Sequence, residues 1–403
     1  MFEPGRKFSF FQGLGRNVII LGAASLLTDV SSQMLYPVIP LFLTGVLHAP
    51  MSVVGLIEGI AESTASLLKV FSGWYSDRLR RRTPFAIVGY AVSAVGKPIL
   101  FLAGSWPLVL LARVVDRVGK GLRAAPRDAM LAASCDPAHR GKAFGLHKAM
   151  DTVGAAIGPV IAVLVMAVMG ASERTYRLLF LLAIIPAVLG VLTLTFLARE
   201  APHAPARTRE DDCPGPAISP DLKKFLVVLG IFAVGNSSNA FLLLKAQQAG
   251  FSAPFVILSY AFYNLVHSLM AMPVGLLSDR LGRKKVMMAG FVMFSAVYFG
   301  FAFTPAPWML WVLFGLYGFY SAATEGIWKA YIADLSTPTN RGTAMGLMQT
   351  VTGILAFVAS AVAGILWTRL GPWAPFLYGA ACSLLAGILF ATLFRRRRPV
   401  PTP

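Results

Sequence analysis

The chain has 403 residues, of which 56% are hydrophobic and 13% are charged, and its mean hydropathy is +0.67. Soluble domains carry about a quarter charged residues, so this composition excludes an ordinary soluble protein. The net charge is +18, but Arg and Lys gather in alternate loops between apolar runs, on one side of a membrane, which argues against nucleic acid as a partner. The three cysteines are far apart, without metal or disulfide spacing, and we expect no cofactor.

Apolar runs of bilayer length dominate the chain, and a spanning helix needs roughly 20 apolar residues. Twelve such runs lie at 17–45, 51–76, 84–104, 107–130, 142–170, 176–198, 224–247, 253–279, 285–303, 307–334, 343–368 and 373–394. They predict an all-α membrane protein with twelve transmembrane helices. The basic loops lie on one side, which places both termini in the cytoplasm of a multi-pass inner-membrane protein. We expect a monomer whose basic face contacts anionic lipid heads.

One segment of the chain occurs twice, about half the chain apart. Gly73 to Arg82 (Gly-Trp-Tyr-Ser-Asp-Arg-Leu-Arg-Arg-Arg) matches Gly275 to Lys284 (Gly-Leu-Leu-Ser-Asp-Arg-Leu-Gly-Arg-Lys), and a second pair, beginning at Arg140 and Arg341, keeps almost the same offset. Two unrelated segments repeated at one spacing indicate a duplicated unit. We therefore predict two pseudo-symmetric six-helix bundles, 1–198 and 223–403, joined by a cytoplasmic linker at 199–222.

Ionisable residues inside the spans are functional candidates, because a charge in the membrane is costly unless it is paired or hydrated. The predicted proton-coupling residues are Asp29, Glu58, Glu62, Arg113, Asp116 and Asp151. The predicted substrate-cavity residues are Gln33, Tyr36, Arg117, Lys148, Asn236, Asn239, Tyr263, Asn264, Glu325 and Lys329. The alternative for the charged residues is a static network, with pairs such as Glu62–Lys69 and Arg113–Asp116, and Glu325–Lys329 suits an intrahelical pair. Every third run is nearly free of charge, which predicts that it stays out of a central watered cavity.

The repeated segment resembles the cytoplasmic motif of the major facilitator superfamily, Gly-x-x-x-Asp-Arg-x-Gly-Arg-Arg, although Arg80 replaces its second glycine in the first copy. The resemblance covers the whole chain and implies two bundles around a cavity that opens alternately to each side. It also implies a cytoplasmic gate that forms when that side closes, against the alternative of simple membrane anchoring by charge. The gate residues are Gly73, Asp77, Arg78, Gly275, Asp279 and Arg280.

The run Gly145, Gly154, Gly158 and Pro159 is similar to the antiporter motif of proton-coupled exporters, where it serves close helix packing. Arg113 followed by Gly119 and Gly121 resembles the fourth-helix motif of the same drug:proton antiporter branch, whose arginine is implicated in proton coupling. The sequence therefore predicts a proton-coupled secondary transporter that works by alternating access and exports a small organic molecule, either drug-like or an anionic or zwitterionic metabolite. The alternative is a proton-driven importer of a nutrient or metal chelate. Hydrolase, metalloprotease and nucleotide-loop motifs are absent, so we expect no enzyme.

Overall fold

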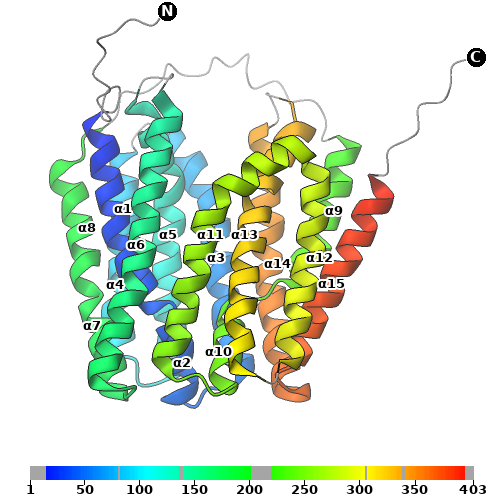
Figure 1. Ribbon diagram of the computed structural model, residues 1–403. Helices are drawn as coiled ribbons and strands as arrows, with labels where there is room; N and C mark the ends of the chain where they lie inside the picture. Colours follow the sequence, from blue (N-terminus) through cyan, green and yellow to red (C-terminus); the bar gives the residue numbers. More distant parts are fainter. Residues whose placement is uncertain are drawn as a thin grey trace, which may run out of the picture.

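The computed structural model describes residues 15–79, 82–135, 139–200, 219–304, 306–337 and 341–394, and these residues form helices and connecting loops (Figure 1). The helices are α1 (Arg16–Leu35), α2 (Val38–Gly45), α3 (Met51–Leu79), α4 (Thr83–Phe101), α5 (Trp106–Ala133), α6 (Arg140–Met169), α7 (Glu173–Leu182), α8 (Ile184–Leu197), α9 (Pro220–Gly235), α10 (Ala240–Gln248), α11 (Ala253–Leu281), α12 (Arg283–Phe303), α13 (Pro307–Leu335), α14 (Arg341–Leu370) and α15 (Ala374–Leu393).

Each of the twelve predicted apolar runs corresponds to one helix or to a broken pair of helices. Ten spans among the described residues are long and apolar enough to cross a membrane. The helices α5 and α13 cover the two remaining runs, and α5 falls outside the apolar set because it carries a stripe of charged residues. The predicted all-α membrane architecture is confirmed.

The helices form two neighbouring groups, α1–α8 and α9–α15 (Figure 1). The repeat is visible in the helix bounds: α11 begins and ends 202 residues after α3, and α13 begins 201 residues after α5. Tyr36 Oη lies 3.4 Å from Ser238 Oγ, again 202 residues apart. Two repeat-equivalent residues can meet in this way when they lie at the pseudo-two-fold axis between the groups. The start of α1 and the end of α15 lie at the same end of the molecule (Figure 1).

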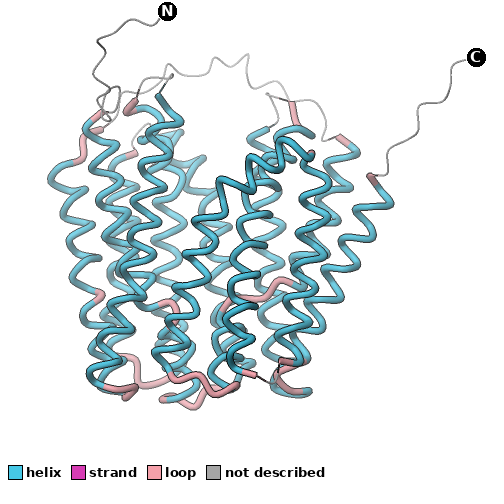
Figure 2. The backbone as a smooth tube through the Cα atoms, viewed as in Figure 1, coloured by secondary structure: helices cyan, strands magenta, loops and turns pink. Residues whose placement is uncertain are grey.

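Two spans are interrupted at matching places in the repeat. The first run breaks at Tyr36–Pro37, between α1 and α2, and the seventh breaks at 236–239, between α9 and α10; Figure 2 shows both as loop inside the bundle. Unwound backbone is tolerated at membrane depth only where it is buried in protein or lines a watered cavity. These breaks therefore mark the region where a cavity is expected.

The two groups are packed most closely along α3 and α14, which run antiparallel. A side chain at Gly55 would begin 2.2 Å from the Ser360 carbonyl oxygen, and one at Gly364 would begin 2.5 Å from that of Met51. Ser63 Oγ also donates to the Gly353 carbonyl over 2.7 Å. The absence of side chains at these glycines allows the backbones to touch, so the molecule is closed at the end away from the start of α1.

The segment predicted as linker, 199–222, lies mostly outside the described residues. Its last part is helical instead: α9 begins at Pro220, and the Ser219 side chain accepts a hydrogen bond from the Leu222 amide. A serine N-cap followed by proline at the first helical position is a strong start signal. The second bundle therefore begins three residues before the predicted boundary at 223.

Candidate functional site

A central cavity lies between the two helix groups and has two connected chambers. The inner chamber holds about 500 Å³ and the outer one about 560 Å³. They share the residues Asp29, Gln33, Glu62, Ser66, Lys120, Arg123 and Tyr263. The outer chamber is lined by α1, α3, α5, α6, α11 and α14. Compared with the inner chamber, it adds Lys69, Arg127 and His267, which lie further along α3, α5 and α11, so it extends toward the end of the molecule where α1 begins. The helices α4, α7, α8, α12 and α15 line neither chamber, which confirms the prediction that every third run stays out of the cavity.

Two ion pairs join α3 to α5 along the cavity wall. Arg113 Nη2 lies 2.7 Å from Glu58 Oε1, and Arg117 Nη2 lies 2.8 Å from Glu62 Oε1. Glu58 is only 1% exposed, whereas the Glu62 side chain is 40% exposed. Charges that are removed from water need such partners, because an unpaired ion carries a desolvation penalty of several kcal/mol. These partners differ from the alternatives Glu62–Lys69 and Arg113–Asp116. The observed pairs run between helices, since Glu58 and Glu62 on α3 and Arg113 and Arg117 on α5 are each four residues apart and face the other helix together.

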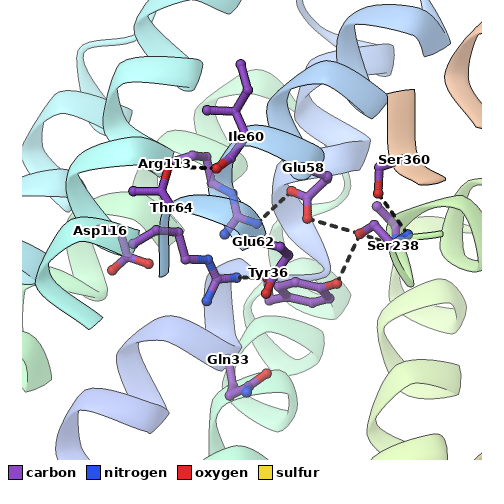
Figure 3. Close-up of polar contacts among 12 residues, drawn as sticks. Gln33, Tyr36, Glu58, Ile60, Glu62, Thr64, Arg113, Asp116, Ser238 and Ser360 are labelled. Carbon is purple, nitrogen blue, oxygen red and sulfur yellow. Dashed lines mark hydrogen bonds and ion pairs between the residues drawn. The ribbon is translucent and has the colours of Figure 1, made fainter. Parts of the chain in front are cut away.

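Glu58 also connects the two bundles (Figure 3). Its second oxygen accepts a hydrogen bond from Ser238 Oγ over 3.1 Å, and the ring of Tyr36 lies beneath Arg113, with the guanidinium carbon 5.7 Å from the ring centroid. Nearby, Tyr260 Oη donates to Gln33 Oε1 over 2.9 Å. The floor of the cavity is therefore a polar junction in which α1 and α3 meet the α9–α10 break and α11.

Asp116 faces the cavity but is held from the other side. Lys97 Nζ and Ser93 Oγ of α4 each lie 2.5 Å from Asp116 Oδ1. Lys97 is the single charge within the third apolar run, and its ion pair with Asp116 explains why a charged residue is tolerated there. The arrangement gives Asp116 a fixed structural partner, in contrast to a carboxylate free to exchange protons.

Asp29 lies in a different environment, although it lines both chambers. It is half-buried and, within the described part of the chain, no hydrogen bond or ion pair ties it to a base. Its electrostatic neighbours are Asp151 of α6 and Lys120, Arg123 and Arg127 of α5. Asp151 itself lies 3.5 Å from His147 Nδ1. Two predicted proton-coupling residues from different helices are thus brought together.

The C-terminal wall of the cavity is polar but uncharged at its centre. Asn236, Asn239, Tyr263 and Asn264 line it, as predicted. Tyr317 Oη donates to Asn239 Oδ1 over 2.8 Å, which holds the α9–α10 break against α13. Lys148, from the opposite bundle, is exposed in the outer chamber.

Of the predicted residues Glu325 and Lys329, only Lys329 has a described side chain. The side chain of Glu325 is outside the described residues, and Lys329 is exposed without lining either chamber. Trp328 lines the inner chamber instead. Lys329 is offset from Trp328 by about 100° around the helix, and it is an electrostatic neighbour of Lys69, which lines the outer chamber.

The structure describes the predicted gate only in its second copy. The surroundings of Gly73 and the side chains of Asp77 and Arg78 lie outside what the structure describes. Near the end of α11, Asp279 and Arg280 are exposed, and no ion pair to another described residue is present. In the same motif, Arg283 pairs with Asp334 and donates to the Ala330 carbonyl over 2.5 Å, both on α13. The described contacts of this motif remain within one bundle.

The predicted glycine motif on α6 packs closely at two of its positions. A side chain at Gly154 would begin 2.5 Å from the Leu26 carbonyl oxygen, and one at Gly158 would begin 2.6 Å from that of Val30. Pro159 is buried beside them. Gly145 is exposed and has no described atom within 4 Å of that position. The contact of α6 with α1 at this end is made by Ala143 instead, which packs with Val18 and Leu21.

Several cavity residues were missed by the sequence-based prediction, above all Arg123, Tyr260, Tyr317 and Trp328. Arg123 falls at the edge of the charged face of α5 when positions are advanced by 100° per residue, so helical spacing could have found it. Four uncharged residues of α13 also follow each other at three- and four-residue intervals, so helical spacing places them on one face: Tyr317, Tyr320, Thr324 and Trp328.

Comparison with known proteins supports this architecture. The family model of the Major Facilitator Superfamily matches residues 21–227 and 225–403. An uncharacterised MFS-type transporter of Methanocaldococcus jannaschii is 35% identical over 93% of this chain and 94% of its own. A class D tetracycline resistance protein of Salmonella ordonez is 22% identical over 96% of this chain and 99% of its own.

Solved structures show the same fold at low sequence identity. A nucleoside transporter covers 94% of this chain and 100% of its own with a TM-score of 0.78 and 14% identity. A peptide transporter covers 97% of this chain and 96% of its own with a TM-score of 0.77 and 13% identity. The family model matches both halves of the chain, and the structure has the duplicated bundles and the central cavity. The chain therefore belongs to the Major Facilitator Superfamily.

Proposed function

We propose that this transporter couples the movement of a small organic molecule to protons, with Asp29 and Asp151 as the proton site. The observation that carries the proposal is the contrast among the carboxylates: Glu58, Glu62 and Asp116 each hold a base at 2.5 to 2.8 Å, whereas Asp29 pairs with no base among the described residues and lines the cavity. A carboxylate without a fixed partner can take up and release a proton without breaking an ion pair. Repulsion from Asp151 is relieved when one of the two is protonated.

The closed seam along α3 and α14, with the chambers on its other side, supports alternating access. Ligand that enters the cavity from one side leaves to the other only if this seam opens. We place the end where α1 begins in the cytoplasm of an inner membrane, because the basic loops gather there. In this orientation the cavity is reached from the cytoplasm, as an exporter requires when it takes up its cargo.

Export is the direction that we favour, and two observations support it. The α6 glycines at 154 and 158 pack as the exporter motif implies, and tetracycline resistance proteins are among the relatives. Net export then requires antiport, in which protons enter as the organic molecule leaves.

Proton-driven import is the second candidate, and the charges around Asp29 favour it. Lys120, Arg123 and Arg127 lie near Asp29, and an anion bound to them would cancel part of their field. Protonation of Asp29 and binding of an anion would then assist each other, as in symport.

Flux in proteoliposomes with an imposed pH gradient tests coupling and direction together. Three probes of different charge are offered outside: naphthalene-2-sulfonate, tetracycline and uridine. An acidic interior should drive accumulation by an antiporter, and an acidic exterior should drive accumulation by a symporter. If all three probes ignore both gradients, the proposed proton coupling is wrong.

The proton site is tested by Asp29→Asn and Asp151→Asn. Each variant should retain exchange of labelled for unlabelled probe but lose accumulation driven by the gradient. Asp221→Asn is the matched control, since Asp221 is exposed and pairs with Lys224 outside the cavity. Gradient-driven accumulation at the normal level in both cavity variants would contradict the assignment.

A further inference from the structure

Two cations in the cavity wall form no ion pair with a described carboxylate, although Asp29 is an electrostatic neighbour of both. Lys120 is exposed in the cavity and Arg123 is 5% exposed, and both line the two chambers. No ion pair or hydrogen bond joins either one to a described residue. The neighbouring cations differ: Arg117 is paired with Glu62, and Arg127 lies 2.9 Å from Asp128.

Arg123 is positioned in a way that leaves hydrogen-bonding capacity unused. Its guanidinium carbon lies 4.5 Å above the ring centroid of Tyr90, and its Nη1 is buried without a hydrogen-bond partner in the described residues. Gly89 makes room for it, because a side chain there would begin 2.7 Å from Arg123 Cβ. Buried donors are nearly always satisfied. Because Nη1 itself has almost no accessible surface, an acceptor from a ligand would reach Arg123 through the part of the side chain that lines the two chambers.

The facing wall is aromatic. The ring centroids of Tyr260 and Tyr263 are 5.9 Å apart, those of Tyr263 and Tyr317 are 5.2 Å apart, and those of Tyr317 and Tyr320 are 5.6 Å apart. Trp328 lines the same chamber. Aromatic side chains hold planar apolar groups by offset stacking and edge contacts, so this wall suits a ring.

We infer that the inner chamber binds an aromatic organic anion, with its acidic group at Arg123 and Lys120 and its ring against the tyrosines of α11 and α13. A guanidinium binds carboxylate or sulfonate oxygens through charge-assisted hydrogen bonds. A chamber of about 500 Å³ lies within the usual range for small-molecule sites. The inference rests on the proposed transport function and names its substrate class.

Equilibrium binding to the purified full chain in detergent tests the inference without any gradient. Naphthalene-2-sulfonate is the probe, because it keeps its charge at all working pH values. Cyclohexanesulfonate keeps the charge without the aromatic ring, and a naphthyl trimethylammonium keeps the ring with the opposite charge. Calorimetry should show binding of the first and at least tenfold weaker binding of the other two. Absence of naphthalene-2-sulfonate binding, or equal binding of either comparison compound, would overturn the inference.

Variants then locate the two parts of the ligand. Arg123→Gln should weaken binding about tenfold to a hundredfold, as expected for loss of a hydrogen bond between charged groups. Arg123→Lys should retain part of the affinity, and Tyr317→Leu should weaken naphthalene-2-sulfonate binding more than cyclohexanesulfonate binding. Arg369→Gln, at an exposed position on α14, is the matched control. An unchanged Kd in folded Arg123→Gln protein would also overturn the inference.

The outcomes separate this inference from the proposed function. Gradient-driven flux of tetracycline or uridine without binding of naphthalene-2-sulfonate would remove the aromatic-anion class and leave proton coupling intact. Binding of naphthalene-2-sulfonate without gradient-driven flux of any probe would remove proton coupling and leave the binding site intact. If Arg123→Gln does not fold, the ligand series on the unchanged protein still decides the question.

Discussion

The two bundles share a backbone plan and differ in the chemistry that they present to the cavity. With an offset of 201 residues, Asp116, Lys120, Arg123 and Arg127 of α5 correspond to Tyr317, Ser321, Thr324 and Trp328 of α13, and all eight line the cavity. With an offset of 202, Glu58 corresponds to Tyr260 and Glu62 to Asn264. The duplicated unit therefore carries charge in one copy and rings, hydroxyls and amides in the other.

This difference assigns the binding of ions and protons to one wall of the cavity and the contact with an apolar ligand to the other. A charged wall in the membrane is stable only when most of its charges are paired, and in the first bundle α3 and α4 supply the partners of α5. Neutral hydroxyl and amide groups need only hydrogen bonds, so the second bundle can present a broad aromatic surface. The first bundle is thus suited to ions and protons, and the second to the shape of a ligand.

The largest effect is expected from breaking the deepest pair of the charged bundle. Arg113→Met leaves Glu58 buried at 1% exposure with Ser238 as its only remaining described partner. Loss of one member of a buried pair costs about 3–5 kcal/mol, because the other charge remains without compensation. Chemical unfolding in mixed micelles measures this loss.

Two comparisons make that result specific. The double variant Arg113→Met with Glu58→Gln should recover most of the lost stability, since no buried charge remains. Lys224→Met breaks the exposed pair with Asp221 at 3.1 Å and should cost only about 0–1 kcal/mol. Equal losses for Arg113→Met and Lys224→Met would show that burial of the pair does not govern its energy.

A smaller effect is expected where the two bundles touch. Gly55→Ala places a methyl group 2.2 Å from the Ser360 carbonyl oxygen, which forces α3 and α14 apart at a cost of about 1–3 kcal/mol. Gly326→Ala is the matched control, because Gly326 lies within α13 with no atom within 4 Å of the new methyl group. It should be neutral or stabilise the protein by up to about 1 kcal/mol. Thermal unfolding in detergent compares them, and similar values for both would contradict the close seam.

The fold could be predicted from the sequence because each membrane-length apolar run, and each copy of the repeated motif, is recognised within one continuous stretch of the chain. Each run became a helix within a few residues, including the broken ones. The start of α9 was misplaced because the cap at Ser219 lies in a segment whose Pro and charge content dominate its appearance. Local hydrogen bonding decided the boundary there, whereas composition had suggested a linker.

The candidate site was readable only in part, for a different reason. Helical spacing identified which charged residues share a face, but the ion partners depend on which helices pack together. Glu58 and Glu62 therefore appeared equivalent to Asp29, although the structure gives each glutamate an arginine from α5. Arg123 and the tyrosines gained meaning only when the two halves were placed opposite each other, since neither the unsatisfied guanidinium nor the aromatic wall is visible in one helix.

The smallest effect is expected from two tyrosine hydroxyls, and it separates contacts between the bundles from contacts within one. Tyr260→Phe removes the bond to Gln33 of the first bundle, and Tyr317→Phe removes the bond to Asn239 of its own bundle. Each bond contributes about 0.5–1.5 kcal/mol. Only the first must break when the closed side opens, so Tyr260→Phe should shift the equilibrium toward opening about twofold to tenfold, whereas Tyr317→Phe should lower stability without that shift.

Spin-label distances across the closed side measure the difference between these variants. The labels are attached at Gly45→Cys and Ser252→Cys, in protein with Cys135, Cys213 and Cys382 replaced by serine. Both positions are exposed, the first at the end of α2 and the second directly before α11. Tyr331→Phe is the control, because its buried hydroxyl has no hydrogen-bond partner among the described residues. A wider distance distribution for Tyr260→Phe alone is the expected result. The same widening for Tyr317→Phe would mean that the two walls do not move as separate bodies, because a bond confined to one bundle would then control the contact between both.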